Sequence, residues 1–119
     1  MNIFFDIQGT LLNEQGDPRP NAREVLLKLA GTDHGVYLWS TAGEGYAAEA
    51  ARFLGVEDAI KGCCLKRHPP EGIAVDYAVD DDEGVVEEYG GYLVVPYGGD
   101  PSDGQLLGVL EAIQASEPG

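Results

Sequence analysis

The chain has 119 residues, 44% of them hydrophobic, which is the size of one ordinary domain with its own core. It holds 21 acidic and seven basic residues, and the net charge of −14 disfavours nucleic acid and anionic membranes as partners. No apolar run approaches the length of a membrane span, and we expect a cytoplasmic protein whose adjacent Cys63 and Cys64 are reduced thiols.

Short apolar runs alternate with amphipathic segments along the first half of the chain. The expected elements are a strand over 3–7, a helix over 21–30, a strand over 36–39, a helix over 43–53 and a short strand near 59–60. Asn21 is the expected N-cap of the first helix, and Gly55 is expected to end the second. Trp39 and Phe53 are expected in the core.

The second half begins with an irregular stretch from Lys61 to Gly72. Beyond it we expect strands over 75–79 and 92–95 and a last helix over 106–115, which Ser102 and Gln105 would open as a capping box. This alternation predicts one domain over 1–119, a three-layer, Rossmann-like α/β sandwich around a five-stranded, mainly parallel sheet.

The charge is unevenly distributed. All seven basic residues precede residue 68, whereas residues 68–119 hold twelve acidic residues and no Lys or Arg. Most of these acidic side chains are typical of a solubilising surface. The run Asp80-Asp81-Asp82-Glu83 is dense enough to be a candidate cation site, because neighbouring carboxylates repel one another until a cation binds.

Polar side chains follow three of the predicted strands. Asp6 ends the first, Ser40 and Thr41 end the second, and Asp80 and Asp81 follow the strand over 75–79. The carboxyl ends of parallel strands meet at one edge of a sheet, where ligands bind. Two sets of carboxylates beside hydroxyl groups predict a Mg²⁺ site that holds a phosphoryl group.

At these positions the sequence resembles the haloacid dehalogenase (HAD) superfamily. Phe4–Leu12 is similar to the first motif of that family, written DxDGTL, and Tyr37–Thr41 is similar to the second, an apolar strand ending in Ser or Thr. Val79–Asp81 resembles the fourth motif, an acidic pair after a strand. Lys66 fits the third motif, a single lysine, with Lys61 as the alternative. The order of the motifs implies a HAD-like fold over the whole chain.

The resemblance implies that Asp6 is a nucleophile that attacks phosphorus and forms an aspartyl-phosphate. It further implies that Mg²⁺ binds the Asp6 carboxylate, the backbone carbonyl of Gln8, and Asp81. Asp80 or Asp82 would lie nearby, and the choice between Asp80 and Asp81 as the direct ligand stays open.

Phosphate binding is assigned by the same resemblance. The Ser40 hydroxyl, Thr41 and neighbouring N–H groups would bind phosphoryl oxygens. Lys66 would balance the charge on Asp6 and on the phosphate, and Gly9 would let the chain leave its strand sharply beside the substrate.

Gln8 departs from the family pattern. Phosphatases of the family carry an Asp at this position, which protonates the leaving group and then activates water. An amide cannot transfer a proton at neutral pH, and losing a general acid costs about 10²–10⁴-fold in rate. An activated phosphate would tolerate this loss, or Glu14, shortly after the motif, would supply another carboxylate.

The cap domains of the family are also missing, because neither the segment Leu11–Pro20 nor the stretch before Lys66 can hold a domain. The open site would suit a large phosphorylated substrate, or would be closed by a protein partner or a second copy of the chain.

The motifs and the departure at Gln8 lead to two candidate functions. The first is a Mg²⁺-dependent phosphohydrolase, slow or restricted to activated phosphates. The second is a non-catalytic metal- or phosphate-binding module that acts through a partner.

Overall fold

The computed structural model describes residues 1–116. They form a five-stranded sheet in the order β3-β2-β1-β4-β5, in which all neighbouring strands run parallel. The strands are β1 (Asn2–Asp6), β2 (Gly35–Ser40), β3 (Gly62–Leu65), β4 (Tyr77–Asp80) and β5 (Gly91–Leu93). The helices are α1 (Ala22–Ala30), α2 (Glu44–Leu54), α3 (Glu83–Tyr89) and α4 (Gln105–Ser116). The expected α/β fold is confirmed.

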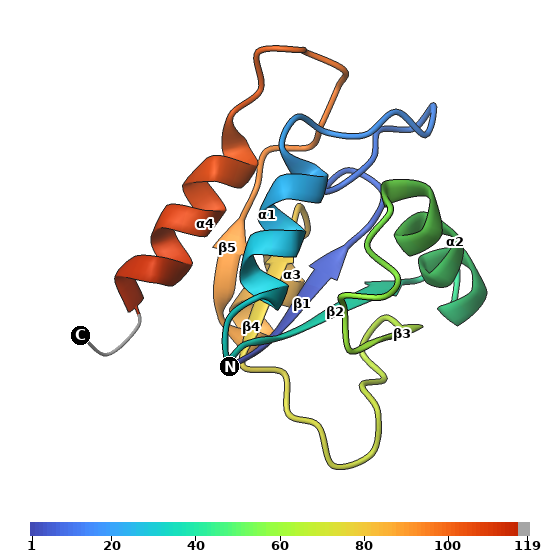
Figure 1. The fold of residues 1–119 in the computed structure, drawn as a ribbon, viewed down its shortest axis with the longest axis vertical. Coiled ribbons are helices and arrows are strands. Elements are labelled where there is room, and N and C mark those ends of the chain that lie inside the picture. The colour runs from blue at the N-terminus through green and yellow to red at the C-terminus, as the bar shows by residue number, and fades with distance from the viewer. Residues whose placement is uncertain (117–119) are drawn as a thin grey trace.

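The sheet is the middle of three layers (Figure 1). Helices α1, α2 and α4 cover one face, and α3 with the segment 66–76 covers the other. Both faces of the central strands are therefore buried, which explains their nearly continuous apolar sequences. Ile3 and Phe5 of β1 face the larger helical layer, while Phe4 faces α3 and stacks on Tyr37 at 4.6 Å between ring centroids. Trp39 is fully buried on this second face, as predicted.

The register of the strands brings the predicted site residues to one edge. Phe5 of β1 pairs with Val79 of β4, so the next residues along these strands, Asp6 and Asp80, follow side by side. On the other side of β1, Asp6 pairs with Trp39, and Ser40 continues one residue further. The carboxyl ends of the three central strands therefore meet, as the sequence predicts.

Two predictions about elements are wrong. The third strand is not at 59–60 but at 62–65, because residues 59 and 60 turn back and donate their N–H groups to the carbonyl of Val56. Helix α3 is missing from the prediction. Only Val85 of this helix is buried, so its sequence shows no repeating apolar face. The helix begins after Asp82, whose carboxylate accepts a hydrogen bond from the N–H of Gly84.

Three local expectations also fail. Asn21 precedes α1 in the left-handed conformation, φ 70°, and its side chain caps nothing. Helix α4 is preceded by Asp103, whose carboxylate accepts from the N–H of Gln105, whereas Ser102 bonds to Asp100, so the predicted capping box does not form. Phe53 is 63% exposed rather than buried.

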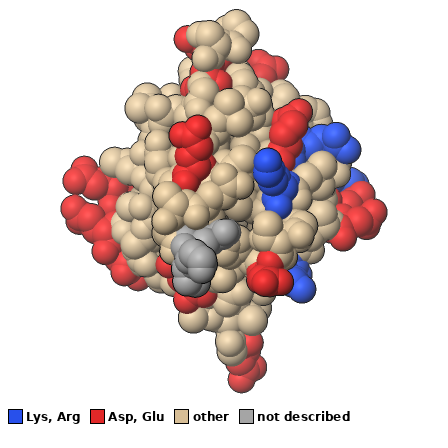
Figure 2. Space-filling model, turned by 60° about the vertical axis from the view of Figure 1, so that its left-hand side comes forward, with Lys and Arg blue, Asp and Glu red and all other residues tan. Residues whose placement is uncertain are grey.

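The surface is acidic and the described helices are short. None of the helices within residues 1–116 has the length and apolar character needed to cross a membrane. Figure 2 shows acidic side chains spread over the face in view, while the basic side chains gather at one side.

Candidate active site

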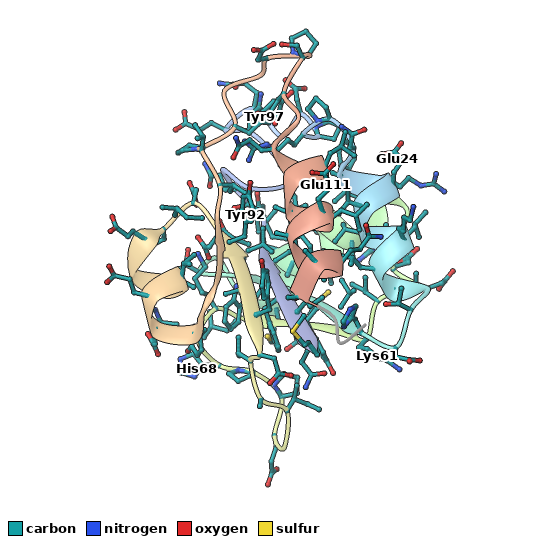
Figure 3. The ribbon with its side chains drawn as sticks, turned by 90° about the vertical axis from the view of Figure 1, so that its left-hand side faces the viewer. Glu24, Lys61, His68, Tyr92, Tyr97 and Glu111 are labelled. Carbon is teal, nitrogen blue, oxygen red and sulfur yellow. The ribbon has the colours of Figure 1, made fainter. Side chains whose placement is uncertain are left out.

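A pocket of about 860 Å³ opens where β1, β2 and β4 end. The predicted site residues in its lining are Asp6, Gln8, Ser40, Thr41, Lys66 and Asp81. The segments 13–15 and 96–98 complete its walls, and Tyr97 in the second of these lies near the end of the sheet where the chain leaves β5 (Figure 3). The structure thus brings all but one of the predicted site residues into one pocket wall, and the remaining one, Asp80, lies buried beside them.

Asp6 is buried at the bottom of the pocket, with 5% of its surface exposed. The hydroxyl of Thr10 donates a hydrogen bond to its Oδ2 over 3.2 Å and holds the carboxylate in place. Burial, reinforced by the nearby Asp80 carboxylate, raises the pKa of Asp6 to about 7, although Lys66 acts in the opposite direction. Without a bound cation, Asp6 therefore holds a proton up to nearly neutral pH.

Lys66 forms ion pairs with the carboxylates at the ends of β1 and β4. Its Nζ lies 3.0 Å from Oδ1 of Asp6 and 3.0 Å from Oδ2 of Asp80. Its backbone N–H donates to the carbonyl of Ser40 over 2.9 Å, so the end of β2 positions it. Burial alone would lower the pKa of Lys66, but the two carboxylates raise it above its usual value. The alternative lysine, Lys61, precedes β3 and lies towards the other end of the molecule from the pocket (Figure 3).

The three acidic residues after β4 have different surroundings. Asp80 is fully buried, and its Oδ1 accepts the N–H of Asp82 over 2.9 Å. Asp82 caps α3. Asp81 is half-buried and lines the pocket, which Asp80 does not. Burial also raises the pKa of Asp80.

The carboxylates of Asp6, Asp80 and Asp81 each offer an oxygen, and these oxygens lie within 4.8 Å of one another. Gly9 makes this approach possible, because a Cβ at that position would lie 2.2 Å from Oδ2 of Asp81. An all-oxygen donor set with surplus negative charge fits Mg²⁺, which would neutralise the repulsion between the carboxylates. The donor set therefore suits this ion.

The end of β2 supplies hydroxyl groups. Ser40 is buried, and its Oγ accepts the N–H of Ala42 over 3.0 Å, which leaves the hydroxyl proton to be donated into the pocket. Thr41 is exposed in the same wall. Gln8 is exposed at the start of the tight turn after β1, in which the N–H of Gly9 donates to the carbonyl of Leu12 over 2.7 Å.

Arg19 connects two segments beside the pocket, a role that the sequence did not indicate. Its side chain is fully buried, and its guanidinium forms a two-point ion pair with Asp103 at 2.9 and 3.0 Å. The same group donates to the carbonyls of Gly9 and Thr10, both at 3.3 Å, and to the carbonyl of Val95. Arg19 thus ties the turn after β1 to the segment after β5. No local pattern marks it, because buried arginines are rare and their partners are distant in sequence.

Solved structures share this architecture of a five-stranded parallel sheet between layers of helices. The chain superposes on D,D-heptose 1.7-bisphosphate phosphatase from B. bronchiseptica, solved with magnesium and phosphate, with a TM-score of 0.65 and 17% identity, covering 98% of this chain and 99% of that one. It is also similar to an uncharacterized protein from Listeria monocytogenes serotype 4b, with a TM-score of 0.59, 13% identity and coverage of 96% and 97%. At these identities the likeness shows the fold alone. No protein-family model and no curated protein matches the sequence.

Proposed function

We propose that the protein is a Mg²⁺-dependent phosphohydrolase that works through an aspartyl-phosphate on Asp6. The observation that carries the proposal is the convergence of Asp6, Asp80 and Asp81 oxygens within 4.8 Å, beside the ammonium group of Lys66. The likeness of the fold to a phosphatase solved with magnesium and phosphate supports it.

Asp6 and Asp81 would hold Mg²⁺ together with the backbone carbonyl of Gln8, and the ion would supply positive charge beside the nucleophile and the phosphate. Asp81 is the better direct ligand of the acidic pair, because it lines the pocket. Asp80 is buried and already engaged by Lys66 and by the N–H of Asp82, so we assign it a positioning role.

In the reaction, one oxygen of Asp6 attacks phosphorus while the bond from phosphorus to the leaving oxygen breaks. The hydroxyl of Ser40, the neighbouring Thr41 and the ammonium group of Lys66 bind the phosphoryl oxygens and stabilise their charge. Water then attacks the phosphorus of the aspartyl-phosphate, which releases inorganic phosphate and restores the Asp6 carboxylate. The Nζ of Lys66 lies 3.0 Å from Asp6, so Lys66 would balance the charge of this carboxylate in both steps.

The Gln8 amide limits both steps, since it can hydrogen-bond but cannot transfer a proton. We therefore expect the enzyme to prefer phosphates whose leaving group needs no proton, such as aryl or acyl phosphates. The absence of a protein-supplied acid at this position also favours a second candidate, a non-catalytic metal- or phosphate-binding module that acts through a protein partner. The two candidates share the same site and differ in turnover.

The test is Mg²⁺-dependent hydrolysis of an aryl phosphate by the wild type and by Gln8→Asp, with Asp6→Asn as the blank. The phosphohydrolase is supported if the wild type exceeds the blank and intact-mass analysis finds a phosphate adduct on Asp6. A silent wild type with an active Gln8→Asp supports the binding module. If both equal the blank while Mg²⁺ still binds, the site does not hydrolyse phosphates.

A further inference from the structure

The pocket carries an unusual charge balance for a site that binds an anion. The described residues of its lining include four carboxylates and one cation. The carboxylates are Asp6, Glu14, Asp81 and Asp82, and the cation is Lys66. A bound Mg²⁺ and Lys66 together bring three positive charges against these four negative ones, so the pocket remains anionic before any phosphate enters.

Lys66, the one cation of the described lining, is already paired with two carboxylates. Lys66 is 9% exposed, and its ammonium group lies 3.0 Å from both Asp6 and Asp80. These two ion pairs hold the ammonium group beside Asp6, the proposed nucleophile. Residues 68–119 contain no Lys or Arg, so the wall formed by residues 81–82 and 96–98 supplies no other cation.

Three of the four carboxylates already have a role. Asp6 and Asp81 belong to the proposed Mg²⁺ site, and Asp82 accepts the N–H of Gly84 and begins α3. Glu14 is the fourth carboxylate, and it has no such role. It is exposed in the pocket wall, on the segment between β1 and α1.

The segment that carries Glu14 is held in a defined conformation. Asn13 is 5% exposed, and its side-chain oxygen accepts the N–H groups of Gln15 and Asp17 over 3.0 and 2.8 Å. The backbone carbonyl of Asn13 accepts the N–H of Gly16 over 3.0 Å. These bonds close a short loop that fixes the backbone of Glu14 beside the pocket.

We infer, on the basis of the function proposed above, that the site prefers phosphate monoesters whose remaining part is cationic or neutral, and that it binds those carrying a second anionic group more weakly. Glu14 is the residue that sets this preference. It attracts a positive group on the substrate and repels a negative one, while Lys66, the one cation in the described lining, is paired with Asp6 and Asp80. The interaction of an exposed side-chain charge with one charge on the substrate changes affinity by about two- to fivefold.

The test compares three monoesters of similar size: 2-aminoethyl phosphate, n-propyl phosphate and 2-phosphoglycolate. Their binding is measured by calorimetry with excess Mg²⁺, for the wild type, for Glu14→Gln and for Glu111→Gln. Glu111 is an exposed acidic residue of α4 outside the pocket lining, so its variant removes the same charge elsewhere (Figure 3).

The expected affinity order is aminoethyl, then propyl, then phosphoglycolate, with about tenfold between the first and the last. Glu14→Gln should shrink this span to less than threefold, and Glu111→Gln should leave it unchanged. Equal affinities, a reversed order, or an equal effect of both variants would overturn the inference. Hydrolysis of an aryl phosphate is measured in parallel. The expected affinity order without turnover would overturn only the hydrolase function, and no binding of any monoester would overturn both.

Discussion

A Cβ placed on Gly9 would lie 2.2 Å from Oδ2 of Asp81, closer than any side chain can approach. The glycine of the turn after β1 therefore leaves the space that the acidic side chain after β4 occupies. Gly9 also has a φ of 87°, in the left-handed region that favours glycine. Its role in the site is thus to let two chain segments, far apart in sequence, share one cation-binding space.

The variant Gly9→Ala should lose Mg²⁺ affinity by at least about tenfold, because Asp81 must move away from the other carboxylates. Gly16→Ala is the matched control, since Gly16 has a φ of 83° but nothing within 4 Å of a Cβ. Both variants should lose about 1 kcal/mol of stability from the backbone conformation. Mg²⁺ titration followed by calorimetry separates them, and equal Mg²⁺ affinity in the two variants would contradict the role given to Gly9.

Mg²⁺ affinity should depend on pH through Asp6. Its pKa in the metal-free protein is about 7, raised by burial, and Mg²⁺ binds the carboxylate form. Affinity should therefore rise about tenfold per pH unit below 7 and level off above it. Calorimetry between pH 5.5 and 8.5 measures this, and an affinity independent of pH over that range would show that Asp6 is not a ligand.

The same pKa predicts how the stability of the metal-free protein changes with pH. The pKa of Asp6 is higher in the folded protein than its ordinary value of 3.8, so folding favours the protonated form. The contribution of this group is complete below about pH 4 and is lost as the pH rises through 7. Urea denaturation of the wild type and of Asp6→Asn, in the presence of a chelator, should show a shallower loss of stability between pH 5 and 8 in the variant.

Lys66→Met should destabilise the metal-free protein by about 3 kcal/mol, because it leaves two buried carboxylates without their cation. Added Mg²⁺ should recover part of this loss, since it returns positive charge to the same place. Lys61→Met, at the amino end of β3, should change stability by less than about 0.5 kcal/mol. Chemical denaturation with and without Mg²⁺ measures both. A similar loss in the two variants would argue against a special role for Lys66.

Asp103→Asn should destabilise the protein by about 3 kcal/mol, because the buried guanidinium of Arg19 loses its carboxylate. The exposed pair of Arg52 and Glu57, 3.6 Å apart, provides the control, and Glu57→Gln should change stability by less than about 0.5 kcal/mol. Thermal and urea denaturation compare the variants. If Asp103→Asn is as harmless as Glu57→Gln, the Arg19 network does not hold the pocket walls together.

Local patterns account for the predictions that succeeded. The strands β1 and β2 are continuous apolar runs that end in polar residues, which is the pattern of parallel strands buried on both faces. The predictions that failed concern weak local signals. The strand β3 lies at the sheet edge with few buried side chains, and α3 has one buried residue, so neither shows the periodicity that marks a central element.

The sequence by itself determined the α/β fold and the edge of the sheet on which Asp6, Ser40 and Asp80 meet, because hydrophobic periodicity and the end of each run are local properties. Only the tertiary structure showed that Lys66, and not Lys61, reaches Asp6, since both lysines flank one short strand and differ in the end at which they lie. The structure alone also revealed the buried network of Arg19. Its partners are up to 84 residues away along the chain, and contacts over such separations leave no pattern in a single sequence.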